Sequence, residues 1–501
     1  MDVDEATEDK QRDSPASVKV CSQHTHLNSY FFHSNKPNQH ADTLAKSLQN
    51  RPNFIFIVAD DLGYADLGCY GGRGFDGFGR QSVSPRLDAL AADGMRFTQG
   101  YSNSPVCSPT RFALMTARWQ YRLRGALEEP INSKAKGSAT LGLPPKLPTL
   151  PGLLRDAGYR TALVGKWHLG YPPHFGPLKS GYDEFFGPMS GGVDYFSHKG
   201  FTGQHDLYEG DLNGKVNTET EQHADGYLTD LLSQRAVDFV KRQSAASQPF
   251  LLSLHYTAPH WPWETRDDAQ IAPEVAANIF HLDGGNIHSY RRMIHHMDEG
   301  IGQVVDALKA SGQLDNTLVV FTSDNGGERF SDNWPLVGGK MDLTEGGIRV
   351  PYIVHWPAGL AESGTQAGTV SHQHCLSMDW SATMLELGCA CAHPAYPLDG
   401  VSLAATLRGQ PNFERPMFWR MNHRQQRAMR LGDWKYLMVD GLEYLFNISA
   451  DERERANLGA KHPERLADMR QSWLAWNDDM GAIPTDASVS LGYGAANMPQ
   501  R

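Results

Sequence analysis

The stretch NFIFIVADD, Asn53–Asp61, joins a short run of Phe, Ile, Val and Ala to two aspartates that follow it directly. Pro52 precedes the run, so the apolar segment is short and has polar or turn-forming residues at both ends. A continuous apolar run of this kind, without alternation, is typical of a strand that is buried on both faces in a largely parallel sheet. The segment therefore predicts an α/β fold with acidic side chains at the end of one buried strand.

The same pattern recurs four times along the chain. The segments are RTALVGKWHLG, with a strand ending at Gly165; PFLLSLHYTAPH, ending near Tyr256; TLVVFTSDNGG, ending at Ser323; and VPYIVHWP, ending near Trp356. Amphipathic helical stretches lie between them, as in SPRLDALAADG, where Ser84 is the expected N-cap and Pro85 the first helical residue. Strands that alternate with helices predict a sheet covered by helices on both faces.

The pattern of apolar and polar residues changes at both ends of the chain. Residues 1–50 are polar with little periodicity, which predicts a disordered tail. Residues 51–398 carry the α/β pattern. Residues 399–501 predict a smaller α+β subdomain with a short antiparallel sheet, from PMFWR, RAMRLGDWKYLMV and LEYLFNI, followed by the helix PERLADMRQSWLAWNDDM.

Composition excludes several classes of protein. The net charge of −11 argues against a nucleic-acid partner, because phosphate binding requires a basic face. The chain has no apolar run long enough for a membrane span, and its start lacks the basic and apolar segments of a secretory signal. The sequence as it stands predicts a cytoplasmic enzyme; a mis-assigned start would allow a periplasmic or secreted one.

Four of the predicted strands are followed at once by unusual polar groups. Each group alone could be a solvated turn, a helix cap or a loop histidine. In an open α/β sheet, however, ligands bind beyond the carboxyl ends of the strands, and four such sets at one edge favour a functional site. The groups are Asp60-Asp61, Lys166-Trp167-His168, His260 after a short loop, and Asp324-Asn325.

The acidic members of this set predict a metal site. Asp60, Asp61, Asp324 and Asn325 offer only oxygen atoms, and adjacent carboxylates repel one another unless a cation lies between them. Oxygen ligands drawn from separate strands favour one Ca²⁺ ion over Mg²⁺, and exclude the His and Cys ligation typical of zinc. The basic members, with two cations from elsewhere in the chain, would hold an oxyanion and move protons: Arg111, Lys166, His168, His260 and Lys340.

Against this background, Cys107-Ser108-Pro109-Thr110-Arg111 resembles the Cys-x-Pro-x-Arg core of the type I, formylglycine-dependent sulfatases of the alkaline phosphatase superfamily. A second sulfatase signature is similar to GYRTALVGKWH, residues 158–168. The paired aspartates, Pro259-His260, the SDNG at 323–326 and Lys340 follow in the order found in that family, and RAMRLGDWKYL extends the likeness into the C-terminal part. One departure is Ala117, where many members carry glycine.

The resemblance implies an arylsulfatase-like hydrolase with a large, mostly parallel mixed sheet sandwiched by helices. It implies that a formylglycine-generating enzyme converts Cys107 to formylglycine (3-oxoalanine), whose hydrated gem-diol attacks sulfur beside the Ca²⁺ and forms a sulfated-enzyme intermediate. Arg111 would stabilise the diol, and His168 would deprotonate it so that sulfate leaves. Lys166, His260 and Lys340 would bind sulfate, the last two also protonating the leaving oxygen of an aryl sulfate or sulfated carbohydrate.

Two alternatives stay open at this point. A phosphonate monoesterase or phosphodiesterase of the same superfamily could share the fold and the formylglycine. A non-catalytic protein that binds sulfated glycans could share the scaffold. Loop residues between the site strands and at the subdomain junction either contact the leaving group or only brace the loops: Asp194, Tyr195, His198, His423 and Arg424.

Overall fold

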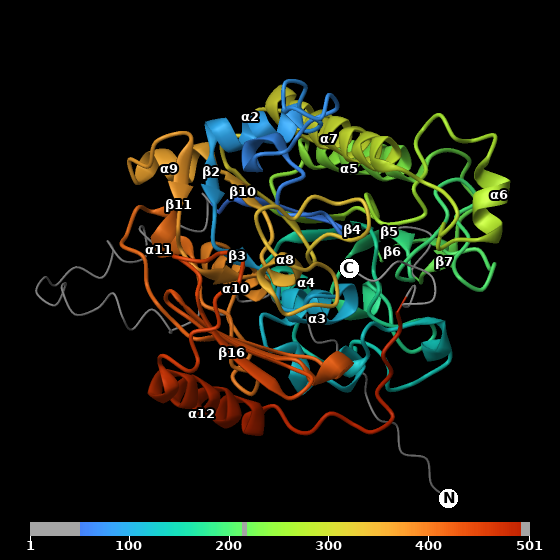
Figure 1. The fold of residues 1–501 in the computed structure, drawn as a ribbon. Coiled ribbons are helices and arrows are strands. Elements are labelled where there is room, and N and C mark those ends of the chain that lie inside the picture. Colours follow the sequence, from blue (N-terminus) through green and yellow to red (C-terminus); the bar gives the residue numbers. More distant parts are fainter. Residues whose placement is uncertain (1–50, 213–217, 492–501) are drawn as a thin grey trace, which may run out of the picture.

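The computed structural model describes residues 51–212 and 218–491. The polar tail predicted at residues 1–50 lies outside the described residues. The chain folds around one large sheet covered by helices, with a smaller sheet and a long helix beside it (Figure 1). The predicted α/β class and the mixed, mostly parallel sheet are confirmed.

The large sheet has ten strands in the order β11-β2-β10-β9-β1-β8-β4-β5-β6-β7. Its five central strands, from β9 to β5, are parallel, and the flanking strands include antiparallel neighbours. The bounds are β1 (Asn53–Ala59), β2 (Met95–Phe97), β4 (Arg160–Gly165), β5 (Glu184–Pro188), β6 (Leu207–Asp211), β7 (Thr220–Glu221), β8 (Phe250–His255), β9 (Thr317–Ser323), β10 (Tyr352–His355) and β11 (Thr369–Ser371).

The last predicted strand of the apolar series, β10, runs antiparallel to β9. A parallel neighbour needs a crossover connection that carries the chain back to the starting edge of the sheet. Here the segment between Ser323 and Tyr352 contains only one short helix, α8 (Glu345–Ile348), so the chain turns back from the edge where β9 ends. This keeps the intervening loop, with Lys340, at that edge.

Alternate residues of β1 enter two different cores. Ile55 and Ile57 pack with α2 (Pro85–Asp93), α5 (Leu228–Gln243) and α7 (Ile287–Ala310), whereas Phe54 and Phe56 pack on the other face. That other face is covered by α3 (Cys107–Thr116), α4 (Leu150–Asp156) and α10 (Ser377–Leu387). Figure 1 shows these two helical layers above and below the strands. Because both faces are covered, β1 has no polar side chain between Phe54 and Ala59.

The remaining helices are short and lie around the sheet. They are α6 (Ala272–Ala277), α9 (Pro357–Glu362) and α11 (Ala404–Leu407), with 3-10 helices at Gly68–Tyr70, Gln120–Arg122, Arg124–Leu127, Ser133–Ala135, Leu178–Ser180 and His423–Gln425. Ser84 is the N-cap residue of α2 and Pro85 its first residue, as predicted. No helix within residues 51–212 and 218–491 is long and apolar enough for a membrane span.

The C-terminal part contains the predicted short antiparallel sheet. Its four strands are β13 (Met417–Arg420), β14 (Arg427–Leu431), β15 (Trp434–Val439) and β16 (Leu442–Asn447), and the predicted helix is α12 (Pro463–Asp479). A further pair, β3 (Gly100–Tyr101) and β12 (Cys375–Leu376), leads into α3 and α10. The indole of Trp419 donates to the carbonyl of Ser102 at 2.8 Å, which ties the small sheet to the segment just before α3.

Candidate active site

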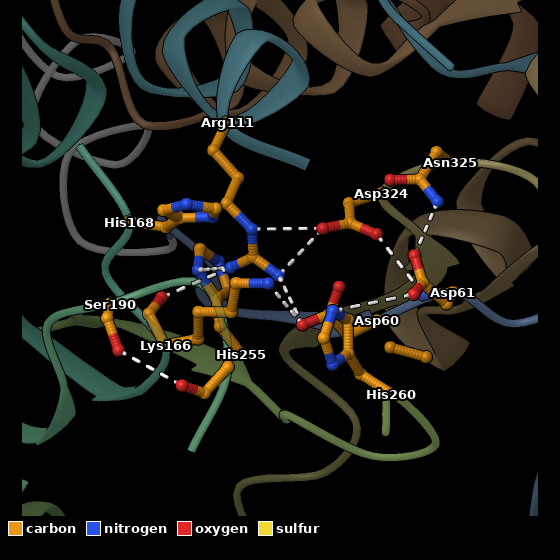
Figure 2. A network of polar contacts seen from close by, with 12 residues as sticks. Asp60, Asp61, Arg111, Lys166, His168, Ser190, His255, His260, Asp324 and Asn325 are labelled. Carbon is orange, nitrogen blue, oxygen red and sulfur yellow. Dashed lines mark hydrogen bonds and ion pairs between the residues drawn. The ribbon is translucent and has the colours of Figure 1, made fainter. Parts of the chain in front are cut away.

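The acidic side chains lie at the carboxyl ends of two neighbouring parallel strands. Ala59 at the end of β1 pairs with Ser323 at the end of β9, so the residues that follow each strand leave the sheet side by side. Carboxylate oxygens of Asp60, Asp61 and Asp324 lie within 4.8 Å of one another, and all three residues are buried. The strand register thus produces the acidic cluster that the sequence predicted, and Figure 2 shows it together with Asn325.

Two oxygen atoms in this cluster have no hydrogen-bond partner among the described residues. They are Oδ1 of Asp60 and Oδ1 of Asn325, and both are buried. The Asn325 amide nitrogen donates to Asp61 Oδ1 at 2.7 Å and to the Gly326 carbonyl at 3.0 Å, which fixes the direction of its unpaired oxygen. Buried polar atoms are normally satisfied, so unpaired oxygens beside three carboxylates fit a positively charged ligand.

The electrostatics of the cluster support the same conclusion. Burial, and then the negative charge of Asp60, raise the pKa of Asp324 to about 6. Burial would also raise the pKa of Asp61, but Lys340 and His260 outweigh it and lower that pKa to about 2. The donor set of carboxylate and amide oxygens fits a hard divalent cation such as Ca²⁺.

Cys107 is the first residue of α3 and points toward this cluster. Its residue is 1% exposed, and its sulfur lies within 4.8 Å of ligand atoms of Asp60 and His260. Burial raises the pKa of the Cys107 thiol well above its ordinary value. An unmodified thiol would therefore stay protonated at neutral pH and be a weak nucleophile.

The polar residues around Cys107 brace the start of α3. The Thr110 hydroxyl donates to the Ser104 carbonyl and accepts from the Ser104 amide, each at 2.9 Å. The Ser108 hydroxyl accepts from the Ile131 amide at 2.9 Å. Ala117 ends the helix with φ 52°, a left-handed conformation in which glycine is the usual residue.

Three cations surround the carboxylates. Arg111 Nε donates to Asp324 Oδ2 at 3.0 Å, Lys166 is ion-paired with Asp60, and Lys340 Nζ lies 2.7 Å from Asp61 Oδ2. Lys166 is fully buried, whereas the Lys340 side chain is 13% exposed. Burial lowers the pKa of Lys340, but Asp61 and other negative groups outweigh it and raise that pKa well above its ordinary value. Lys340 is thus a charged donor on the side that solvent reaches.

The two predicted histidines are held in defined orientations. His168 Nε2 lies 2.7 Å from the Ile131 carbonyl, and a carbonyl can only accept, so Nε2 carries the proton. His168 Nδ1 is buried and has no partner among the described residues. Burial, and then the charge of Lys166, lower the pKa of His168 well below its ordinary value, which leaves Nδ1 as a free base. His260 Nδ1 lies 2.6 Å from the Trp261 carbonyl, and its Nε2 lies 3.6 Å from Asp61 Oδ2.

Backbone strain also concentrates here. Asp61, His168 and Met341 all have positive φ values, of 64°, 57° and 72°, although none is glycine. Each such residue costs about 1–3 kcal/mol and is retained where the surroundings fix it, often at functional sites. The three strained positions are a proposed metal ligand, the proposed base and the residue directly after Lys340.

The residues predicted for the leaving-group side have mixed placements. Asp194 Oδ1 accepts from the amides of Phe196 and Ser197, and the Tyr195 hydroxyl donates to the His260 carbonyl at 2.9 Å. Asp194, Tyr195 and His198 are all buried, as Arg111 and Lys166 are, and both roles predicted for them stay open. His423 and Arg424 lie at the surface of the C-terminal subdomain, and Arg424 is paired with Asp440 at 2.9 Å.

Two contributors to the site were missed in the sequence. His255, the last residue of β8, places Nδ1 3.4 Å from Arg111 Nη1. Its position at the end of an apolar run was the available signal. Gly191 lies against His168: a Cβ there would be 2.4 Å from the imidazole Cε1, so only glycine leaves the ring its place. No sequence pattern predicts that contact, because the two residues meet only in the folded chain.

Comparison with known proteins places this site in a family. The family model described as Sulfatase matches residues 52–388. The chain is 33% identical to N-acetylgalactosamine-6-sulfatase of Canis lupus familiaris over 398 residues, which covers 77% of this chain and 71% of that protein. It is 30% identical to arylsulfatase J of Mus musculus, over 72% of this chain and 56% of that protein.

Solved structures agree with this placement. The crystal structure of Ps i-CgsB in complex with k-i-k-neocarrahexaose has a TM-score of 0.73 and 32% identity, and the match covers 86% of this chain and 94% of that one. The phosphonate monoester hydrolase of Agrobacterium radiobacter, at 18% identity and a TM-score of 0.56, shares the fold. The family match, the relatives and the fold together show that this chain belongs to the sulfatase family, whose members are sulfate ester hydrolases of the alkaline phosphatase superfamily.

Proposed function

We propose that this sulfatase hydrolyses a sulfate monoester of a carbohydrate, using formylglycine made from Cys107. The observation that carries the proposal is the position of Cys107, at the first residue of α3, with its sulfur beside Asp60 and His260. The relatives named for N-acetylgalactosamine 6-sulfate and the structure solved with a carrahexaose support a sulfated sugar as the substrate class.

The oxygen cluster would hold one Ca²⁺ ion, with Asp60, Asp61, Asp324, Asn325 and residue 107 as ligands. Bound there, the ion would draw electron density from the sulfate oxygens and favour ionisation of a nearby hydroxyl. The two unpaired oxygens, on Asp60 and Asn325, support this assignment.

The reaction follows from the side chains around residue 107. One hydroxyl of its hydrated aldehyde forms a bond to sulfur while the bond from sulfur to the sugar oxygen breaks. Lys340, which is charged and the most exposed cation of the cluster, donates a proton to that leaving oxygen, assisted by His260. Lys166 and Arg111 hold the sulfate oxygens and the diol, each kept in place by an aspartate.

Release of sulfate needs a base, and His168 is placed to act as one. Its unpaired Nδ1 takes the proton of the second hydroxyl, the aldehyde re-forms, and the bond from carbon to the sulfate oxygen breaks. Water then hydrates the aldehyde again. General-base assistance of this kind contributes about 10²–10⁴-fold. A thiol could not follow this route, because sulfur carries no second hydroxyl.

The rim of the site would select the sugar. His423 and Arg424 lie beside the loop that carries Lys340, and we assign them to contacts with the leaving group. The phosphonate monoesterase alternative shares the fold with this chain, and no observation favours it. The non-catalytic alternative predicts a lost chemical group, whereas all six predicted catalytic residues are present around residue 107: Cys107, Arg111, Lys166, His168, His260 and Lys340.

The proposal is tested by substitution at position 107. Cys107→Ala should lower turnover of 4-nitrophenyl sulfate and of a sulfated sugar by at least about 10⁴-fold, since the nucleophile is lost. Its melting temperature should stay near that of the wild type. Cys107→Ser should accumulate a sulfated serine, visible in the intact mass, because an ester without a second hydroxyl cannot expel sulfate.

A matched control is Cys389→Ala, which removes an exposed cysteine far along the chain and should leave turnover unchanged. The peptide containing residue 107, taken from protein made in its natural host, should have the mass of the aldehyde or its hydrate. Sulfate release by the Cys107→Ala variant, or an unconverted thiol in fully active protein, would refute the proposal.

A further inference from the structure

We propose that Gln426, in the C-terminal subdomain, is a positioning residue for Lys340. This inference rests on the proposed function in one respect, namely that Lys340 donates the proton to the leaving oxygen. Gln426 is 2% exposed and precedes β14. Its side-chain oxygen accepts from the Leu343 amide at 2.8 Å, and its side-chain nitrogen donates to the Met341 carbonyl at 2.8 Å. One amide therefore binds the main chain on the C-terminal side of Lys340 at two points.

The loop around Lys340 requires such support. Gly338 has φ 80° and Met341 has φ 72°, so the main chain is left-handed two residues before Lys340 and again directly after it. A left-handed methionine costs about 1–3 kcal/mol and persists only where contacts fix it. The Lys340 and Met341 amides donate to the carbonyls of Gly327 and Pro105, at 3.1 and 2.8 Å. Gln426 fixes the Met341 carbonyl, the other polar group of the strained residue.

Gln426 is itself held rigidly against the catalytic domain. The turn at residues 421–426 closes with a bond from the Met421 amide to the Gln426 carbonyl at 2.9 Å. The two carboxylate oxygens of Glu129 accept from the amides of Asn422 and His423, at 2.6 and 2.9 Å. A continuous set of contacts thus runs from Glu129 through this turn to the Lys340 loop. Through Gln426 the subdomain contributes to the site by fixing the main chain of the loop that carries Lys340.

The chemistry of the amide group explains why glutamine suits this position. An amide carries its acceptor oxygen and its donor nitrogen on separate atoms, so one side chain can bind the Leu343 N–H and the Met341 carbonyl together. Leucine would satisfy neither group, and glutamate would place an acceptor against the Met341 carbonyl. In both cases Lys340 keeps its charge, but its ammonium group is no longer held in position. A misplacement of about 1 Å can lower a rate by about 10²-fold.

A misplaced proton donor has a specific kinetic signature. A leaving group that is stable as an anion, such as 4-nitrophenolate, departs with little need for a proton. A less stable one, such as 4-methoxyphenolate, depends on the donor. Displacement of the Lys340 ammonium group should therefore slow hydrolysis of 4-methoxyphenyl sulfate much more than that of 4-nitrophenyl sulfate. General damage to the fold would slow both equally.

The experiment measures kcat for these two aryl sulfates in Gln426→Leu, Gln426→Glu and Lys340→Met, with Gln425→Leu as the exposed neighbouring control. We expect Gln426→Leu to lower kcat about 10–100-fold for the methoxy ester and less than about threefold for the nitro ester. Lys340→Met should show the same selectivity, and adding Gln426→Leu to it should cause no further loss. Gln425→Leu should match the wild type.

Equal losses on both esters, or a loss from Gln426→Leu that adds fully to that of Lys340→Met, would overturn the inference. Gln426→Glu gives the same comparison if the leucine variant does not fold, because it keeps the acceptor for the Leu343 amide. Failure of the proposed function is distinguishable: a wild-type enzyme without sulfatase activity, or Lys340→Met without leaving-group selectivity, would refute the role of Lys340 before Gln426 is considered.

Discussion

Two clusters of buried charge lie in this molecule, one at the carboxyl ends of β1 and β9 and the other between α8 and the C-terminal sheet. Both contain carboxylates with almost no exposure, and both draw their partners from distant parts of the chain. They differ in how many carboxylates converge and in which oxygen atoms are left without a hydrogen bond, and that difference separates the proposed metal site from a structural contact.

The cluster at α8 is complete within the protein. Glu345 Oε1 lies 2.9 Å from Lys435 Nζ, and Glu345 Oε2 accepts from the Tyr101 hydroxyl at 2.7 Å and from Arg430 at 3.2 Å. Burial would raise the pKa of Glu345, but Lys435 and Arg430 outweigh it and lower that pKa to about 2. Lys435 also bridges to Glu454 at 2.8 Å. Both oxygens of Glu345 are therefore bonded, and Glu454 Oε1, which makes no hydrogen bond, lies against Lys435.

In the cluster at β1 and β9 each carboxylate also has a cation partner, but three carboxylates converge within 4.8 Å of one another. Oδ1 of Asp60 and Oδ1 of Asn325 have no hydrogen-bond partner among the described residues, and the pKa of Asp324 is raised to about 6. The same residue types, equally buried, thus form a structural contact where two glutamates share the cations Arg349, Arg430 and Lys435. They form the proposed metal site where three carboxylates converge.

The strongest test of this difference is Asp324→Asn. We expect turnover to fall by at least about 10⁴-fold, because the variant loses a proposed Ca²⁺ ligand and the charged partner of Arg111. Adding Ca²⁺ to chelator-treated wild type should raise the unfolding free energy by about 2.7 kcal/mol at a hundredfold excess over Kd. Thermal unfolding with and without Ca²⁺ should show no such increment in Asp324→Asn.

Asp315→Asn is the matched control, since Asp315 is exposed just before the opposite end of the same strand, β9. It should retain both turnover and the increment with Ca²⁺. A full increment in Asp324→Asn would show that the ion binds elsewhere.

A second test removes the centre of the other cluster. Glu345→Ala leaves Arg430 and Lys435 buried without their main partner, and breaking a buried pair in this way costs about 3–5 kcal/mol. Urea unfolding should show this loss, while the increment with Ca²⁺ stays at the wild-type value. Glu452→Ala, at an exposed glutamate nearby, should change stability little. If Glu345→Ala were nearly neutral, the charge in this cluster would not be structural.

Asp194 and Glu264 form a further buried carboxyl pair, which can be compared with the two clusters. Burial, and then the charge of Asp194, raise the pKa of Glu264 to about 9. The folded state then holds a proton that the unfolded state loses above about pH 4.5. The stabilising contribution is full below that pH and falls as pH rises toward 9. Between pH 5 and pH 7, the free energy of unfolding of Glu264→Gln should fall by about 2 kcal/mol less than that of the wild type.

Urea unfolding across this pH range measures the difference, and Glu274→Gln, on exposed α6, is the control that should keep the wild-type slope. Identical pH slopes in the wild type and Glu264→Gln would mean that Glu264 is ionised in the folded protein.

Local patterns predicted much of this architecture. The run from Asn53 to Ala59 is a strand because every residue from Phe54 onward is buried, and such runs can be recognised without knowledge of their neighbours. The segment RAMRLGDWKYLMV forms the adjacent strands β14 and β15, with Gly432 and Asp433 between them. The antiparallel direction of β10 was not predictable, because it depends on where the preceding loop stays.

The candidate site divides in the same way. The acidic pairs at residues 60–61 and 324–325 could be placed at one sheet edge, since strand ends in a parallel sheet converge there. No sequence pattern predicts three other contacts: those of His255 with Arg111, of Gly191 with His168, and of Gln426 with the Lys340 loop. The sequence left two roles open for Asp194, and the structure adds that its buried carboxylate accepts from two amides of its own loop.

By itself, the sequence determined which segments are buried strands and which polar residues follow them, because apolar runs and strand-end residues are local properties of the chain. Only the tertiary structure decided which carboxylates converge on one point and which are dispersed among cations. That outcome depends on the register of β1 against β9 and on distances between residues hundreds of positions apart. Burial multiplies the energetic consequence of each such distance, so the distinction between contact and site appears only in the folded molecule.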